Sequence, residues 1–273
     1  MKNERILVAV KTYPTLSSTH IELVCTAGVR EDGSWVRVYP VPFRFLDGDR
    51  KFSKWHWVEL PLIKREKDAR PESHSPVDRH KIDLLEEVGT HDNWRQRKEL
   101  ILEKGKVWTN MTELICAAKR NDCSLATFKP TKIEFQYQGC EREWDENKLA
   151  AAQNQMSQQG LFEDDAVPDN FRIADKVPYD FSYKITDDDE RVSTLKILDW
   201  EIGMLYWNCL KTANGDEKTA LSKVYQKYGE EFLQKDIHLF LGTSLQWHNV
   251  GPNPWMIIGV FPPPIERQMS LAI

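Results

Sequence analysis

Two short β-type runs separated by a tight turn constrain this chain more than any other feature. The runs cover residues 22–29 and 34–41, and the turn between them holds Glu31-Asp32-Gly33. An Asp-Gly step between two such runs is a strong hairpin signal, because glycine accepts the positive φ that tight turns require. The segment therefore predicts an antiparallel strand pair near the start of the chain.

The second run of this hairpin carries different chemistry on its two faces. Side chains alternate along a strand, so Trp35, Arg37 and Tyr39 share one face, while Val36 and Val38 share the other. A guanidinium between aromatic rings can stack on a base or bind phosphate, whereas the valines can seal a core. The pattern predicts a surface that contacts a ligand. In the alternative interpretation, the rings cover the core and the arginines cap them from solvent.

Further strands are predicted around this hairpin, at residues 6–10 and 54–63. The four runs together indicate an α+β protein in which a small antiparallel β-barrel, OB-like or related, packs with a mixed helix and strand half. We expect an OB-like β domain at residues 1–80, a helical and strand connector at 81–160, and an α+β C-terminal domain at 161–273.

Three stretches outside the barrel strands lead to specific expectations. Residues 64–80 contain two prolines and many charges, which predicts an exposed loop that serves as a binding loop or a connector. Residues 81–88 are expected to form a short helix. The acidic run 187–190 is expected at a solvated hairpin tip, because it lacks the glycine and the spaced ligands of a calcium-binding loop.

The charge distribution bears on nucleic-acid binding. A net charge of −5 opposes a strong nonspecific grip on DNA, yet residues 30–81 carry many of the basic side chains and residues 141–190 many of the acidic ones. OB-like barrels combine a basic groove with aromatic rings, on which stacking contributes roughly 1–3 kcal/mol per base. The candidate nucleic-acid contacts are Arg30, Trp35, Arg37, Tyr39, Arg44, Lys51 and Lys54.

Motifs for metals, cofactors and membranes are missing from the sequence. The five cysteines form no Cys-x-x-Cys pair, and Gly-rich phosphate-binding motifs are absent, so we predict no metal site and no cofactor. No apolar run approaches the roughly 20 residues of a membrane span, and the amino terminus leads straight into a β-type run. We expect a cytoplasmic protein without a membrane partner.

Two polar groupings outside the hairpin are candidates for chemistry. Asp199 and Glu201 follow an apolar strand and precede a helix, where carboxylates can hold a divalent metal or act as general acid and base. Asp199 suits a helix N-cap equally well, with Glu201 in the first turn. Thr243 and His248 offer a hydroxyl and a base within one loop, but a Gly-x-Ser-x-Gly motif is lacking.

Short motifs in this chain resemble those of known bacterial proteins. The segments 25–28, Cys-Thr-Ala-Gly, and 33–37, Gly-Ser-Trp-Val-Arg, resemble the Cys-x-x-Gly and Gly-x-Trp-[Ile/Val]-Arg pattern of proteins with OB-like barrels, including the dual OB-containing group. Residues 196–201 and 239–243 resemble segments of uncharacterised bacterial proteins, some of which lie near antiviral or mobile genes. The resemblance implies a role in antiviral defence or a mobile-element system.

Three functional hypotheses follow from the sequence. The leading hypothesis is a nucleic-acid-binding protein, for single strands or duplexes, that uses the face of Trp35, Arg37 and Tyr39. The second is a nuclease-like, metal-dependent enzyme acting on nucleic acid or nucleotides, with Asp199 and Glu201 at its site. The third is a protein-interaction subunit that docks a partner chain on its Trp-rich face.

Overall fold

A closed β-barrel forms the N-terminal part of the molecule. The computed structural model describes residues 3–16, 21–41, 44, 52–78, 81–159 and 171–266. The first strands are β1 (Asn3–Lys11), β2 (Thr15–Leu16), β3 (Glu22–Val29), β4 (Trp35–Val41), β5 (His56–Lys64), β6 (Ser73–Pro76) and β7 (Asp83–Glu87). The barrel order is β1-β3-β4-β6-β5, and β5 pairs back to β1. The predicted α+β class and OB-like barrel are therefore confirmed.

The hairpin of β3 and β4 forms as its sequence predicts. Gly33 has φ +81° in the turn, and β3 pairs antiparallel with β4. Val36 and Val38 are buried in the barrel interior, with 0% and 4% of their surface exposed. Gly28 is required for closure, because a Cβ atom there would lie 2.2 Å from the carbonyl oxygen of Leu7 on β1.

Two predictions after β5 are wrong. Residues 64–80 are not loop throughout, because Ser73–Pro76 forms β6, which pairs parallel with β4 and closes the barrel. The predicted helix at 81–88 is instead the strand β7, whose backbone pairs with β5. Both strands are short and lack an alternating apolar pattern, so their pairing depends on neighbours that are distant in sequence.

The C-terminal half contains two sheets and the helices. Its elements are α1 (His91–Lys98), a π-helical turn (Glu99–Glu103), β8 (Val107–Trp108), α2 (Met111–Lys119), β9 (Leu125–Phe128), β10 (Lys132–Gly139), α3 (Glu146–Gln159), β11 (Tyr179–Thr186), β12 (Val192–Lys196), α4 (Trp200–Thr212), α5 (Glu217–Tyr225) with further helical turns to Gln234, β13 (His238–Thr243) and β14 (Trp255–Phe261). One sheet has the order β10-β11-β12, and the other has the order β14-β13-β9-β8. Within the described residues, no helix combines the length and apolar character that crossing a membrane requires.

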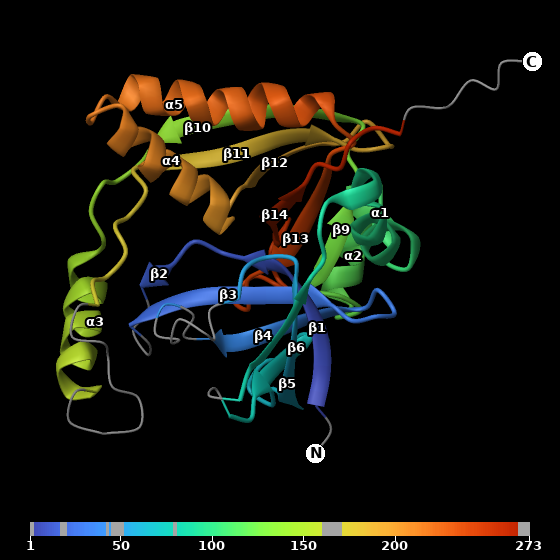
Figure 1. Ribbon diagram of the computed structural model, residues 1–273, viewed down its shortest axis with the longest axis horizontal. Coiled ribbons are helices and arrows are strands. Elements are labelled where there is room, and N and C mark those ends of the chain that lie inside the picture. Colours follow the sequence, from blue (N-terminus) through green and yellow to red (C-terminus); the bar gives the residue numbers. More distant parts are fainter. Residues whose placement is uncertain are drawn as a thin grey trace, which may run out of the picture.

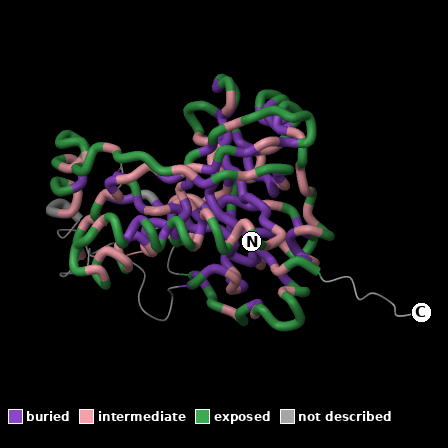
Figure 2. Tube along the Cα trace, turned by 90° about the horizontal axis from the view of Figure 1, so that it is seen from above, coloured by how far each residue is buried: buried purple, intermediate pink, exposed green. Residues whose placement is uncertain are grey.

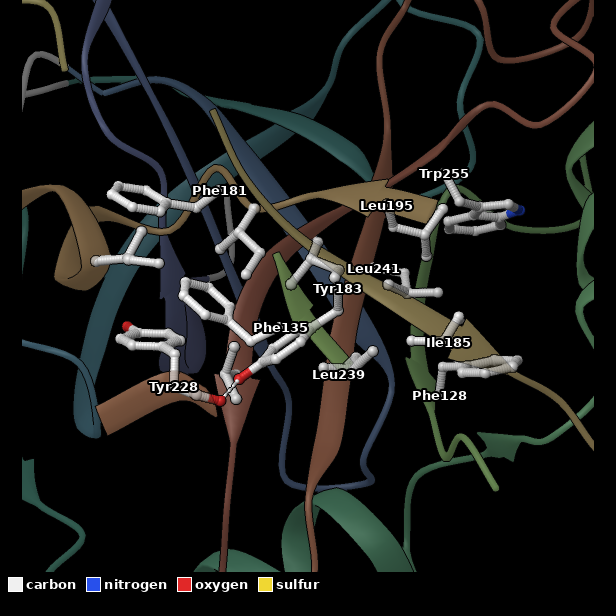
Figure 3. Close-up of a cluster of buried hydrophobic side chains, with 14 of the residues drawn as sticks. Phe128, Phe135, Phe181, Tyr183, Ile185, Leu195, Tyr228, Leu239, Leu241 and Trp255 are labelled. Carbon is white, nitrogen blue, oxygen red and sulfur yellow. Dashed lines mark hydrogen bonds between the residues drawn. The ribbon is translucent and has the colours of Figure 1, made fainter. Parts of the chain in front are cut away.

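The largest core lies between these two sheets and their helices (Figure 3). Aromatic side chains from β10 and β11, including Phe135 and Phe181, face Leu239 and Leu241 of β13. The Tyr183 hydroxyl, fully buried there, donates a hydrogen bond to the Tyr228 carbonyl oxygen at 2.7 Å. That bond satisfies a polar group whose burial would otherwise be costly.

The acidic run 187–190 has a structural role that its sequence does not reveal. It lies at the predicted hairpin turn between β11 and β12, and residues 188–190 are exposed as expected, whereas Asp187 is only 1% exposed. Its carboxylate accepts a hydrogen bond from the backbone N–H of Met111, at the first residue of α2, while Asn110 caps the same helix. An acidic group at a helix N-terminus stabilises the helix.

The barrel and the C-terminal half share a second core. In Figure 1, β13 and β14 lie between the barrel and the layer of β10–β12 with α4 and α5. Phe240, Ile258 and Phe261 of these strands pack against Leu7 and Ala27 of the barrel. Figure 2 shows the buried residues running through the centre of the molecule. The two halves are therefore joined by continuous apolar packing.

Candidate functional site

A cavity of about 450 Å³ lies where the two halves meet. Its barrel wall comes from β3, β4 and the loops that follow β1 and β5, and its other wall includes residues of β11, β13 and β14. In OB barrels, the face of the second and third strands and the loops 1–2 and 4–5 bind oligonucleotides and oligosaccharides. Because β3 and β4 are the second and third barrel strands, the cavity occupies that face.

The side chains of the predicted contact face on β4 have two different environments: one packs against the C-terminal half, and two line the cavity. Trp35 contacts Phe240 of β13 edge-on, with ring centroids 5.1 Å apart, and so helps to hold the two halves together. Arg37 and Tyr39 line the cavity. The face is therefore not an open surface, because the C-terminal half covers it.

Arg37 is the most deeply buried charge of this face. It is 4% exposed, and its guanidinium donates hydrogen bonds to the Ser124 hydroxyl at 3.0 Å and to the Ser124 carbonyl oxygen at 3.1 Å. A longer bond of 3.4 Å reaches the carbonyl oxygen of Thr243. Burial, together with the smaller effect of the neighbouring cation Arg70, lowers the pKa of Arg37 to about 10. These neutral oxygens orient the cation without neutralising it.

Arg65 supplies a second cation at the cavity. Its guanidinium carbon lies 4.3 Å from the ring centroid of Tyr39, in a cation–π contact. Burial raises the pKa of Tyr39, so its hydroxyl stays protonated. Among the residues that the structure describes, neither Arg37 nor Arg65 forms an ion pair.

Three ion pairs at the cavity neutralise the charges of their members. Arg70 donates to both carboxylate oxygens of Asp68, at 2.9 and 2.7 Å. Burial opposes ionisation of Asp68, but the hydrogen bonds and charge of Arg70 lower the pKa of this carboxyl well below its usual value. Lys196 pairs with Asp180, and Asp199 pairs with Lys54. Arg37 and Arg65 are not members of these pairs, although the nearby carboxylates of Glu72 and Asp68 attract the Arg37 cation.

Thr243 and His248 do meet, as their sequence spacing allows. The Thr243 hydroxyl lies 2.9 Å from His248 Nδ1, and His248 Nε2 lies 2.9 Å from Asn121 Oδ1. Asn121 Nδ2 donates to the Ala69 carbonyl oxygen, which leaves Oδ1 to accept from Nε2–H and Nδ1 to accept from the hydroxyl. The chain of bonds holds Thr243, whose carbonyl oxygen receives hydrogen bonds from both Arg37 and Arg70.

Asp199 occupies the N-cap of α4, as one of its two interpretations predicts. Its carboxylate accepts the Glu201 N–H and forms bonds of 2.7 and 2.8 Å with Lys54 Nζ. Asp199 and Lys54 are both buried, whereas the Glu201 side chain is 56% exposed and lies 3.2 Å from the same lysine. In the described part of the chain, no three His, Cys, Asp or Glu side chains gather as a metal site. Catalytic roles for Asp199 and Glu201 stay a prediction.

The structure does not bring the remaining predicted contacts to the cavity. Arg30 pairs with Glu4 and lines a separate groove beside Trp35. Arg44 pairs with Glu22 and donates to the carbonyl oxygen of Arg172. Lys51 lies outside the described residues. Contacts of these three side chains with nucleic acid stay predictions.

Sequence reasoning missed Arg65 and Arg70 as members of the site. Both precede β6 in the proline-containing stretch that the sequence left open as a binding loop or a connector. No local sequence pattern marks β6, so this stretch is identified as the OB loop between strands 4 and 5 only once the structure shows β6 as the fifth barrel strand.

These features define an α+β protein with an OB-like barrel whose β3–β4 face is covered by a second α+β unit. Residues 106–272 match the model described as "Domain of unknown function (DUF8757)", and residues 2–103 match "Domain of unknown function (DUF8758)". Because the first match spans more than half of the chain, the protein belongs to the DUF8757 family.

Two further comparisons add little to this assignment. No curated protein matches the chain. Among solved structures, a murine DNA-binding protein bound with double-stranded DNA aligns with 99% of this chain and 100% of its own, at 9% identity and a TM-score of 0.29. A TM-score of that size does not indicate a shared fold.

Proposed function

We propose that the protein binds nucleic acid through the junction cavity, with Arg37, Arg65 and Tyr39 as contacts. One observation carries the proposal: the β3–β4 face of the OB-like barrel lines a partly open cavity that is bordered by two guanidinium groups outside the ion pairs of the described residues. A buried cation is costly unless an anion or a full set of polar partners compensates it. A phosphate group in the cavity would add a negative charge beside both cations, and guanidinium matches phosphate geometry.

Fluorescence anisotropy with single-stranded and duplex DNA and RNA, at two salt concentrations, tests the proposal. The informative variant is Arg65→Ala, because Arg65 is half-buried at the cavity and its contact with Tyr39 is not part of a core. The matched control is Lys132→Ala, which removes the same charge from a 70% exposed side chain on β10.

We expect salt-sensitive binding that Arg65→Ala weakens about tenfold or more, because a hydrogen bond to a charged group contributes about 1.5–3 kcal/mol. The slope of log K against log salt should also fall by about 1 in this variant. Lys132→Ala should bind like the wild type. Absence of binding to all probes, or equal effects of the two substitutions, would overturn the proposal.

The other two hypotheses have less structural support. Tryptophan rings that could dock a partner chain are packed within the molecule: Trp35 contacts Phe240, Trp57 is 4% exposed, and Trp55 packs against Phe261 at 5.3 Å between centroids. The hypothesis of a nuclease-like enzyme depends on Asp199 and Glu201, and both carboxylates form ion pairs with Lys54. Both hypotheses, and the antiviral or mobile-element context, stay predictions.

A further inference from the structure

We infer that the cavity takes a terminal nucleotide bearing a phosphate monoester, rather than the interior of a strand. The inference rests on the proposed function and specifies its ligand. The same chemistry occurs at a phosphorylated strand end and in a free nucleoside monophosphate. Three features of the cavity carry it: the space left on the barrel face, the cations outside ion pairs, and the apolar remainder of the lining.

The space on the barrel face fits about one nucleotide. OB folds that track a strand contact roughly 4–16 nucleotides along an accessible groove. Here Phe240 covers the Trp35 end of that face, and Ser124 is hydrogen-bonded to Arg37 at its middle. What is left is a cavity of about 450 Å³, in the lower part of the range of roughly 300–1,000 Å³ that buries a single drug-sized ligand. A strand passing along the face would collide with β9 and β13.

The charge at the cavity favours a monoester over a diester. A terminal phosphate carries about −1.5 to −2 charges at pH 7, whereas each phosphodiester carries one. Arg37 and Tyr39 lie two residues apart on one face of β4, roughly 7 Å along the strand, and Arg65 stacks on Tyr39. Both guanidinium groups border one cavity, and a doubly charged phosphate gains more from two cations than a singly charged one does.

The rest of the lining suits a base and a sugar. Tyr13, Phe181, Ile202 and Met256 contribute apolar surface from both halves of the molecule. Ser244 also lines the cavity, and its buried hydroxyl has no hydrogen-bond partner among the described residues. That hydroxyl can bond to a base edge or a sugar oxygen, which would satisfy a group that is otherwise costly to bury.

The experiment compares single-stranded DNA probes of one sequence with the full-length protein. The probes are linear with a 5′-phosphate, linear with a 3′-phosphate, linear without a terminal phosphate, and covalently circular. A nucleoside monophosphate and the corresponding nucleoside serve as competitors. Wild type, Arg65→Ala and the control Lys132→Ala are measured in parallel, and a cooperative urea transition in each variant confirms that it is folded.

We expect one of the phosphorylated linear probes to bind at least tenfold more tightly than the circle. The nucleoside monophosphate should compete with it, and the nucleoside should not. Arg65→Ala should reduce the difference between phosphorylated and unphosphorylated ends, whereas Lys132→Ala should preserve it.

The outcomes separate this inference from the proposed function. Circular and linear probes that bind equally, with no effect of the terminal phosphate, would overturn the inference and leave nucleic-acid binding standing. Binding of the free monophosphate without binding of any strand would support the cavity chemistry and refute nucleic acid as its ligand. Failure of every strand and of the monophosphate would overturn both.

Discussion

Substitution of Asp199 separates its structural role from a catalytic one. The carboxylate is buried, contacts Lys54 Nζ through both oxygens, and caps α4 through the Glu201 N–H. Asp199→Ala would leave the 6% exposed lysine side chain without its closest carboxylate. Removing one partner of a buried ion pair typically costs about 3–5 kcal/mol, and loss of an N-cap adds about 1 kcal/mol.

Glu201 supplies the matched comparison because it contacts the same lysine from solvent. With 56% of its side chain exposed, Glu201→Gln should cost no more than about 1 kcal/mol. The double variant Lys54→Met/Asp199→Leu removes both buried charges, and apolar replacement of a buried pair is often close to neutral. We therefore expect it to be markedly more stable than Asp199→Ala, with a residual loss near the 1 kcal/mol of the missing cap.

Urea denaturation of the four proteins, followed by far-UV circular dichroism, measures these differences. We expect wild type to have the highest transition midpoint, Glu201→Gln and the double variant to lie slightly below it, and Asp199→Ala to have the lowest. Equal losses in Asp199→Ala and Glu201→Gln would show that the buried ion pair is not what matters. An unchanged midpoint in Asp199→Ala, together with loss of a metal-dependent activity, would favour the catalytic hypothesis instead.

Two further predictions concern packing and pH. Trp35→Ala should lower the free energy of unfolding by about 1.5–3 kcal/mol, because it removes a partly buried ring that packs on Phe240. Trp247→Ala, at a 53% exposed residue, should change it by less than about 0.5 kcal/mol, and comparable losses of the two variants in urea denaturation would contradict the assignment of Trp35 to the junction. Burial, assisted by the charge of Lys54, lowers the pKa of Lys11 from 10.5 to about 8, so between these values the unfolded chain binds more protons and stability rises with pH. The stability of wild type relative to Lys11→Met should therefore increase from about pH 8 to pH 10.5 and stay constant below that window; a difference that is flat or falls across the window would refute the shift.

Local patterns were sufficient for much of the barrel. Alternation along β4 correctly separates the buried Val36 and Val38 from the face of Arg37 and Tyr39, and the Asp-Gly turn identifies the hairpin. Asp199 is likewise recognisable as an N-cap from its place before α4. These features depend on neighbours within a few residues, so the sequence alone contains their physical cause.

Neither the strand β6 nor the cavity could be predicted from local sequence patterns. Ser73–Pro76 has no apolar alternation, and it is a strand because β4 and β5 offer backbone partners on both sides. Arg65 and Arg70 reach the cavity only because β6 closes the barrel. The sequence alone therefore shows them only as charged residues of a loop.

The sequence by itself determined the OB-like barrel, its α+β partner and the two chemically distinct faces of β4. Only the tertiary structure decided that the aromatic and basic face is covered by the C-terminal half, with Trp35 against Phe240, Lys54 against Asp199, and Arg37 and Arg65 at a shared cavity. The physical reason is the range of the interactions. Alternation and capping act between close neighbours in the chain, whereas the cover over a face comes from segments far away in sequence, whose approach is governed by the packing of the whole molecule.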